Sequence, residues 1–142
     1  MDIALAEASH AGGAGEVPVG AVLVWDGQVI ARDHNRREER ADPLAHAELL
    51  VIREAARHLG QWRLERAALV VTLEPCPMCM GAILQARIPV LAYGAADPKA
   101  GAAGSLFDLT DDPRLNHVVE VVRGVRSDEA SKLLRRFFQQ RR

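Results

Sequence analysis

The chain has 142 residues, of which 49% are hydrophobic and 26% charged, and its formal net charge at pH 7 is −1. This length suits a single domain, because domains cluster at about 100–200 residues. The apolar fraction excludes a wholly disordered chain. The small net charge argues against a protein that coats nucleic acid through bulk charge, although a local basic patch stays possible. We therefore expect one domain over residues 1–142.

Cysteine content and the absence of targeting signals favour a cytoplasmic protein. The two cysteines stand in one short stretch and are too few for a secreted disulfide scaffold. No apolar run reaches the roughly 18 residues of a membrane span. The N-terminus also lacks the basic start and apolar core of a signal peptide.

The first half of the chain predicts a helix, a hairpin and a second helix. The Ala-rich segment 2–10 is typical of a short helix, which the glycines after it end. Two extended runs, 17–24 and 28–33, flank an Asp-Gly turn and predict an antiparallel hairpin. Asp42 and Pro43 open a helix that Gly60 ends.

The second half predicts three more strands and two more helices. The Val-rich run 67–73 is typical of a strand buried on both faces, and 90–93 and 118–122 predict shorter strands. Helices are expected over 75–87 and 128–140. This order predicts an α/β fold of three layers, α/β/α, with a five-stranded mixed sheet led by the hairpin.

A long irregular stretch separates Tyr93 from His117. Loops of this length are uncommon unless they bind something or hold small helices. We interpret it as a candidate substrate loop, and the alternative is a tolerated surface insertion.

The clearest chemical signal is His-Ala-Glu at 46–48, followed by Pro-Cys-Pro-Met-Cys at 75–79, each at an expected helix start. Cys76 and Cys79 are three residues apart, so they share a face of a helical first turn. If the two helix starts converge, His46 and both thiols surround a single point. The positive helix ends also favour thiolates there.

Three donors of this kind predict an open zinc site. Structural zinc sites close with four protein ligands, whereas catalytic sites leave one position for water. The chain has only two cysteines, and no other histidine stands at ligand spacing. Zinc lowers the pKa of bound water toward about 7. Glu48 could take a proton from that water and return it to a substrate nitrogen.

Each half of this pattern also has a simpler explanation. A C-x-x-C pair alone is more often a redox pair or half of a closed structural zinc site, and a lone His-x-Glu indicates almost nothing. The conjunction is stronger, because residue type, order and helix-start placement agree. Iron stays an alternative to zinc with these ligands.

The pattern H-x-E…P-C-x-x-C is the signature of zinc-dependent deaminases of the cytidine-deaminase-like superfamily. From about residue 17 to residue 142 the sequence resembles one branch, the bacterial tRNA-specific adenosine deaminases. The segment Asp-Pro-Lys-Ala-Gly-Ala-Ala-Gly-Ser-Leu at 97–106 is similar to the tRNA-acting branch in particular. Shorter similarities lie at 17–22, 35–36, 42–43, 72–76, 94–95, 116–117 and 137–138.

The resemblance implies a role for each of these residues. The three metal ligands would hold one zinc ion per subunit, and Glu48 would be the proton shuttle. Asn35 would hydrogen-bond the flipped nucleoside. Contacts to the anticodon stem-loop are expected from Asp97, Lys99, Arg141 and Arg142. The resemblance also implies a cytidine-deaminase-like fold and a homodimer with sites near the interface, with neither a membrane nor a nucleotide cofactor as partner.

The implied reaction is hydrolytic deamination of the wobble adenosine of an arginine tRNA to inosine. A zinc-activated hydroxide attacks C6 of adenine, Glu48 protonates the ring nitrogen, and ammonia leaves. One alternative is a free-base or nucleoside deaminase, acting on guanine or cytosine with the same metal site. Another is a zinc-stabilised RNA-binding module without activity. The long loop and the basic C-terminal helix favour the tRNA substrate.

Several of these residues also have plain structural explanations. An Asn that ends a strand commonly shapes a turn, and Asp97-Pro98 is ordinary turn chemistry. The C-terminal arginines could lie on the solvated face of an amphipathic helix. Glu74 could order a neighbouring loop or cap a helix, and we assign it no catalytic role. Of Phe137 and Phe138, at least one should be in the core.

Overall fold

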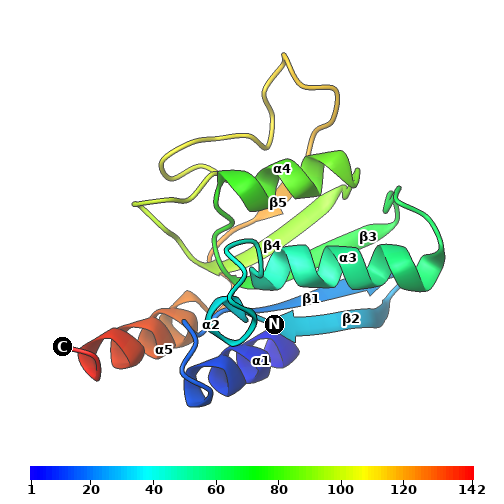
Figure 1. Ribbon diagram of the computed structural model, residues 1–142. Helices are drawn as coiled ribbons and strands as arrows, with labels where there is room; N and C mark the ends of the chain where they lie inside the picture. Colours follow the sequence, from blue (N-terminus) through cyan, green and yellow to red (C-terminus); the bar gives the residue numbers. More distant parts are fainter.

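The computed structural model describes residues 1–142 and contains one five-stranded sheet in the order β2-β1-β3-β4-β5 (Figure 1). The strands are β1 (Gly20–Trp25), β2 (Gln28–His34), β3 (Ala67–Leu73), β4 (Val90–Ala95) and β5 (Glu120–Val122). β1 runs antiparallel to β2 and β3, whereas β3, β4 and β5 run parallel to one another. The sheet is therefore mixed and begins with a hairpin, which confirms the predicted architecture.

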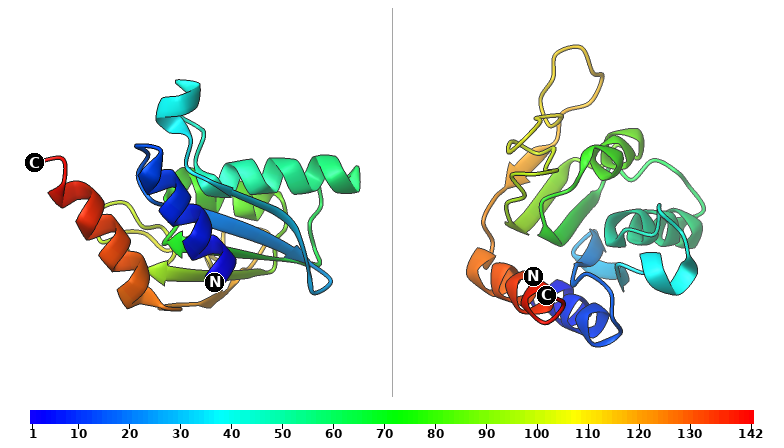
Figure 2. Two further views of the ribbon diagram at one scale, coloured as in Figure 1. Left: turned by 90° about the horizontal axis from the view of Figure 1, so that it is seen from below. Right: turned by 60° about the vertical axis from the view of Figure 1, so that its left-hand side comes forward.

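Helices cover both faces of the sheet (Figures 1 and 2). α3 (Ala47–Leu59) and α4 (Pro77–Gln85) lie on one face, and α1 (Asp2–Gly13) and α5 (Ser127–Gln139) lie on the other. α1 packs so closely on β1 that a Cβ at Gly20 would lie 2.1 Å from the carbonyl oxygen of Ala4. Only glycine permits this approach. None of the helices has the length and apolar character needed to cross a membrane.

The hairpin turn between β1 and β2 has the chemistry that its sequence predicts. Asp26 and Gly27 both have positive φ, at 50° and 78°. Positive φ at both central residues gives the two-residue turn whose twist matches the flanking strands. The turn therefore fixes the pairing of Trp25 with Gln28 at the end of the hairpin.

The core between the sheet and α4 is aliphatic. Leu69 and Val71 of β3 and Met80 and Ile83 of α4 are fully buried in one hydrophobic cluster. Burial of a side chain of this size contributes about 1.5–3 kcal/mol relative to exposure. The cluster also holds Leu84, and it fixes the start of α4 against the end of β3.

Several element boundaries differ from the predictions. β1 begins at Gly20, so residues 17–19 lead into the strand rather than belong to it. α3 begins at Ala47 and not at Asp42. The Asp42 carboxylate accepts the backbone N–H of Leu44 at 2.9 Å, so the Asp-Pro pair shapes a turn ahead of the helix. α4 likewise begins at Pro77 rather than Pro75.

One short helix, α2 (Arg37–Arg40), was not predicted. Its four residues are all charged, so no apolar periodicity marks it in the sequence. Between β4 and β5 the chain has no helix or regular strand, only an isolated bridge between Ala103 and Asp108. The predicted long irregular loop is therefore confirmed.

Candidate active site

The starts of α3 and α4 meet at one pocket. His46 is the N-cap residue of α3 and Cys76 is the N-cap residue of α4, and both have extended backbone angles. An N-cap residue lies outside the helical spiral, so its side chain is free to point across the helix start. Cys79 follows in the first turn of α4. The structure thus brings together the three side chains that the sequence singled out as metal ligands.

The separations of these donors suit a tetrahedral zinc ion. His46 Nδ1 lies 3.5 Å from Cys79 Sγ and 3.8 Å from Cys76 Sγ. With sulfur at about 2.3 Å and nitrogen at about 2.0–2.1 Å from zinc, tetrahedral ligands lie about 3.5 Å apart. No fourth His, Cys, Asp or Glu ligand atom joins the group. The residues therefore fit a zinc ion with one open coordination position.

The two sulfurs differ in protonation when no metal is bound. A hydrogen bond from Cys79 outweighs burial and, with a further one from His46, lowers the pKa of Cys76 to about 4. The same bond to Cys76, together with burial, raises the pKa of Cys79. The hydrogen bond with Cys76 also raises the pKa of His46. A cation that binds both sulfurs therefore displaces the proton of Cys79.

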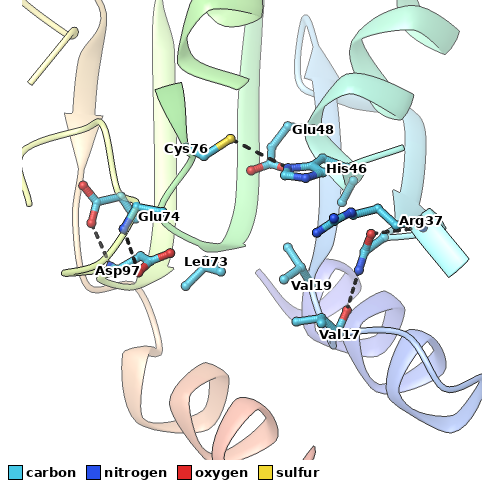
Figure 3. A pocket seen from close by; sticks show the side chains of 12 residues that line it. Val17, Val19, Arg37, His46, Glu48, Leu73, Glu74, Cys76 and Asp97 are labelled. Carbon is cyan, nitrogen blue, oxygen red and sulfur yellow. Dashed lines mark hydrogen bonds between the residues drawn. The ribbon is translucent and has the colours of Figure 1, made fainter. Parts of the chain in front are cut away.

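Glu48 lies beside this group at the second position of α3 and is only 4% exposed (Figure 3). Burial raises the pKa of Glu48 to about 7. It lines the same pocket as His46 and Cys76 but does not join the donor group. A carboxyl group with this pKa can both accept and release a proton at neutral pH, as general acid–base catalysis requires.

Two segments form opposite sides of the pocket (Figure 3). On one side lie Asn35 and Arg37, which we call the α2 wall. On the other side lie Asp97 and Ala100, at the start of a turn that we call the 97–105 loop. Between them the pocket is lined by Val17, Val19 and Leu73. The pocket thus joins an apolar floor to polar sides, as ligand sites commonly do.

Asn35 shapes a turn and also faces the pocket. It is 6% exposed, its Nδ2 donates to the carbonyl oxygen of Val17 at 3.3 Å, and its Oδ1 accepts the backbone N–H of Arg37 at 3.3 Å. The structural explanation offered by the sequence is therefore present. An amide nitrogen carries two hydrogens, so a second one is left for a ligand.

Asp97 and Lys99 occupy one tight turn with different exposure. Asp97 lines the pocket, and its Oδ1 accepts the backbone N–H groups of Lys99 and Ala100 at 3.0 and 3.2 Å. The side chain of Lys99 is exposed and does not line the pocket. The turn therefore presents a carboxylate inward and an ammonium group to solvent.

Comparison with known proteins agrees with this chemistry. A family model described as MafB19-like deaminase matches residues 1–142. The tRNA-specific adenosine deaminase of Bacillus subtilis (strain 168) is 51% identical over 142 residues, which cover 100% of this chain and 88% of that protein. The chain belongs to the tRNA-specific adenosine deaminase family.

Two solved structures have folds similar to that of this chain. A structure from work on A-to-I editing by tRNA:A34 deaminases at the wobble position has a TM-score of 0.91 and 51% identity, covering 94% of this chain and 97% of that one. A guanine deaminase from Nitrosomonas europaea has a TM-score of 0.78 and 26% identity, covering 96% of this chain and 81% of that one. The five-stranded mixed sheet is thus that of a deaminase.

The C-terminal arginines of the deaminase have different surroundings. Arg141 lies 4.1 Å above the ring of Phe137 and donates from Nη2 to the carbonyl oxygen of Gly15 at 2.8 Å. It also lines a second cavity with Asn35 and the rest of the α2 wall. Arg142 is exposed and lines neither cavity. Phe137 is buried and Phe138 is exposed, so one of the two is in the core as predicted.

A second cluster of possible metal ligands lies outside the pocket. His34 Nδ1 is 2.9 Å from Glu7 and 3.6 Å from Asp33. Asp33 already accepts a hydrogen bond from Arg36 Nε at 2.7 Å, and Arg32 lies 3.7 Å from Glu7. Because cations of the protein itself pair with both carboxylates, we interpret this cluster as an ion-pair network that joins α1 to β2.

The sequence did not reveal two residues of the deaminase site. Arg37 lies in the α2 wall, and Glu16 is buried behind that wall with its carboxylate on the backbone of α2. The only signal for Glu16 in the sequence was its place as an acidic residue next to the apolar run that leads into β1. For Glu74 the sequence left two explanations, ordering a loop or capping a helix, and the structure confirms the first.

Proposed function

We propose that this deaminase converts the wobble adenosine of a tRNA anticodon loop to inosine by hydrolytic deamination, with an arginine tRNA as the expected substrate. The observation that carries the proposal is the buried Glu48 beside a group of three possible metal ligands, His46, Cys76 and Cys79. Identity of 51% across the whole chain to an adenosine deaminase specific for tRNA supports adenosine in RNA as the substrate.

In this proposal His46, Cys76 and Cys79 hold one zinc ion per subunit. When bound, zinc supplies Lewis acidity that activates a water molecule for attack on C6 of adenine. Glu48 accepts one proton from the attacking water and delivers it to the ring nitrogen. It then carries the second proton, from the new hydroxyl group at C6, to the amino group, and the C6–N bond breaks to release ammonia. Burial raises the pKa of Glu48 to about 7, close to neutral pH, which supports a role in both accepting and releasing a proton.

The same proposal assigns the contacts to RNA. Asn35 uses its second amide hydrogen to orient the flipped base, which an unpaired loop releases at low cost. Asp97 and Lys99 contact nucleotides beside the target from the 97–105 loop. The proposal also places Arg141 and Arg142 on the phosphates, and for Arg141 it is supported by the cavity shared with Asn35.

We further propose that the enzyme is a homodimer that acts in the cytoplasm, where its tRNA substrate resides. Support for the dimer comes from an apolar groove between α3 and α4 that includes Leu49, Ile52 and Trp62, whose side chain is 59% exposed. We expect Ile52→Glu to shift the light-scattering mass from dimer to monomer. Val29→Glu, at another exposed apolar residue, serves as the control and should leave a dimer.

The substrate is tested by offering an anticodon stem-loop, free guanine and free cytosine in parallel and measuring ammonia. We expect release from the stem-loop alone. The structural similarity to a guanine deaminase makes guanine the relevant competitor. Ammonia from a free base and none from RNA would overturn the proposal.

A further inference from the structure

Two buried glutamates, Glu74 in the lining of the pocket and Glu16 beside it, take no part in the chemistry described so far. Glu74 and Glu16 are each only 2% exposed. In both cases the hydrogen-bond partners include backbone N–H groups more than 20 residues further along the chain. A carboxylate is an acceptor with about four lone-pair positions, so it can gather several N–H donors at once.

Glu74 holds the 97–105 loop at both ends. Its Oε2 accepts the backbone N–H of Asp97 at 2.9 Å, on the pocket side (Figure 3). Its Oε1 accepts the backbone N–H groups of Ala103 and Ser105, each at 3.0 Å. The hydroxyl group of Ser105 donates to the same carboxylate. One buried side chain thus joins the two ends of a loop that has no helix or regular strand.

The loop is wrapped tightly around this carboxylate. A Cβ at Gly101 would lie 2.3 Å from Glu74 Cδ and 2.6 Å from the carbonyl oxygen of Asp97. Glu74 itself directly follows β3 and stands two residues before Cys76. The position of Asp97 is therefore fixed relative to a metal ligand through a short, buried connection.

Glu16 has the same relation to the opposite side. Its Oε1 accepts the backbone N–H of Glu39 at 2.8 Å, and its Oε2 accepts that of Glu38 at 3.2 Å. These groups belong to α2, whose first residue, Arg37, lies in the α2 wall. Glu16 adjoins Val17, which lines the floor of the pocket. Each side of the pocket is thus attached to the floor by one buried carboxylate.

We propose that Glu74 and Glu16 are positioning residues for RNA binding, which set Asp97 and Arg37, respectively, at fixed places around the metal-binding donors. In this proposal both residues act through the backbone N–H groups that they bind, although Glu74 also lines the pocket. The inference rests on the proposed function, because it takes RNA to be what these two sides grip.

Double-mutant cycles on the affinity for the anticodon stem-loop test this proposal. Glu74→Gln keeps the side-chain size but turns one oxygen into an NH₂ group that faces N–H donors. We expect it to weaken RNA binding and raise KM roughly tenfold, with a much smaller change in kcat. Asp97→Ala should then weaken binding far less in the Glu74→Gln background than in the wild type, because Asp97 has already lost its position.

The opposite side supplies the matched control. Glu16→Gln combined with Asp97→Ala should raise the Kd for the stem-loop by the product of the two single-variant factors, since the two residues act on different sides of the pocket. Glu16→Gln combined with Arg37→Ala should raise the Kd by less than the product of the two single-variant factors. A general loss of stability would not distinguish these pairs. Multiplied effects in the Glu74–Asp97 pair, or unchanged affinity in Glu74→Gln, would overturn the proposal.

Amide hydrogen exchange separates this inference from the proposed function. In Glu74→Gln we expect faster exchange confined to the 97–105 loop, with metal content unchanged. Ser105→Ala keeps the buried carboxylate and serves as the second variant if Glu74→Gln folds poorly. We expect it to speed exchange in the same loop, but by less. Wild-type protein that binds the stem-loop without deaminating it would refute the proposed function and leave the cycles interpretable. Wild-type protein that does not bind RNA would refute both.

Discussion

His46 Nδ1 and Cys79 Sγ lie 3.5 Å apart although they belong to the starts of two different helices. The helices α3 and α4 lie side by side on one face of the sheet, so their N-termini meet at one place (Figure 1). A helix N-terminus carries a partial positive charge that favours thiolates and carboxylates. The fold therefore prepares these donors to receive a cation and places Glu48 beside them.

Replacing either sulfur should remove the metal. We expect Cys76→Ser and Cys79→Ser each to purify with little or no zinc and with a lowered Tm, because metal binding and folding are coupled. Elemental analysis and calorimetry measure the two effects. Either variant with a full complement of metal would show that its sulfur is not a ligand.

Metal binding should also release protons. In the metal-free protein the pKa of Cys79 is raised above its ordinary value of 9.0 by its hydrogen bond to Cys76, so this thiol carries a proton at neutral pH. We expect at least about one proton per zinc ion at pH 7, measured in weakly buffered solution with a pH indicator. Binding without proton release would contradict this view of the donor group.

Glu48 should make the stability of the metal-free protein depend on pH. Burial raises its pKa from 4.5 to about 7, so folding favours the protonated form. Its favourable contribution is complete below about pH 4.5 and is lost as the pH rises through about 7, a change of up to about 3 kcal/mol. Denaturant unfolding should therefore show that wild type loses stability relative to Glu48→Gln between pH 5 and pH 8. A constant difference would mean that the Glu48 carboxyl is not desolvated.

The sequence predicted the sheet, the hairpin and the grouping of His46 with the two cysteines, because local patterns mark the elements that carry them. The Asp-Gly turn, the Val-rich run of β3 and the Cys pair are readable without tertiary information. The start of α3 was misplaced because Asp42 can cap a helix or shape a turn with the same oxygen.

The hydrogen bonds by which Glu16 and Glu74 hold distant backbone segments could not be predicted from the sequence. The hydrogen bonds of Glu16 and Glu74 span more than 20 residues and reach backbone N–H groups, which every residue type offers except proline. No residue pattern therefore marks their partners. The short helix α2 was missed for the related reason that a buried carboxylate, and not an apolar face, holds it in place.

Arg141 should contribute to RNA affinity through charge. We expect Arg141→Ala to raise KM more than it lowers kcat and to flatten the dependence of RNA binding on salt concentration. It also loses the contacts with Phe137 and Gly15, so a small fall in Tm is expected. Arg142→Ala, which loses no such contact, serves as the comparison. An unchanged salt slope would restrict Arg141 to a structural role.

The central claim is hydrolysis at adenosine with Glu48 as the proton carrier, and isotope incorporation tests it most directly. The stem-loop is incubated in ¹⁸O-labelled water with wild type or Glu48→Gln, and the nucleosides are analysed by mass spectrometry. We predict one ¹⁸O atom in each inosine formed by wild type, and turnover at least about 10²–10⁴-fold slower in Glu48→Gln with zinc and RNA binding retained. Inosine without ¹⁸O, or normal turnover by Glu48→Gln, would contradict the account.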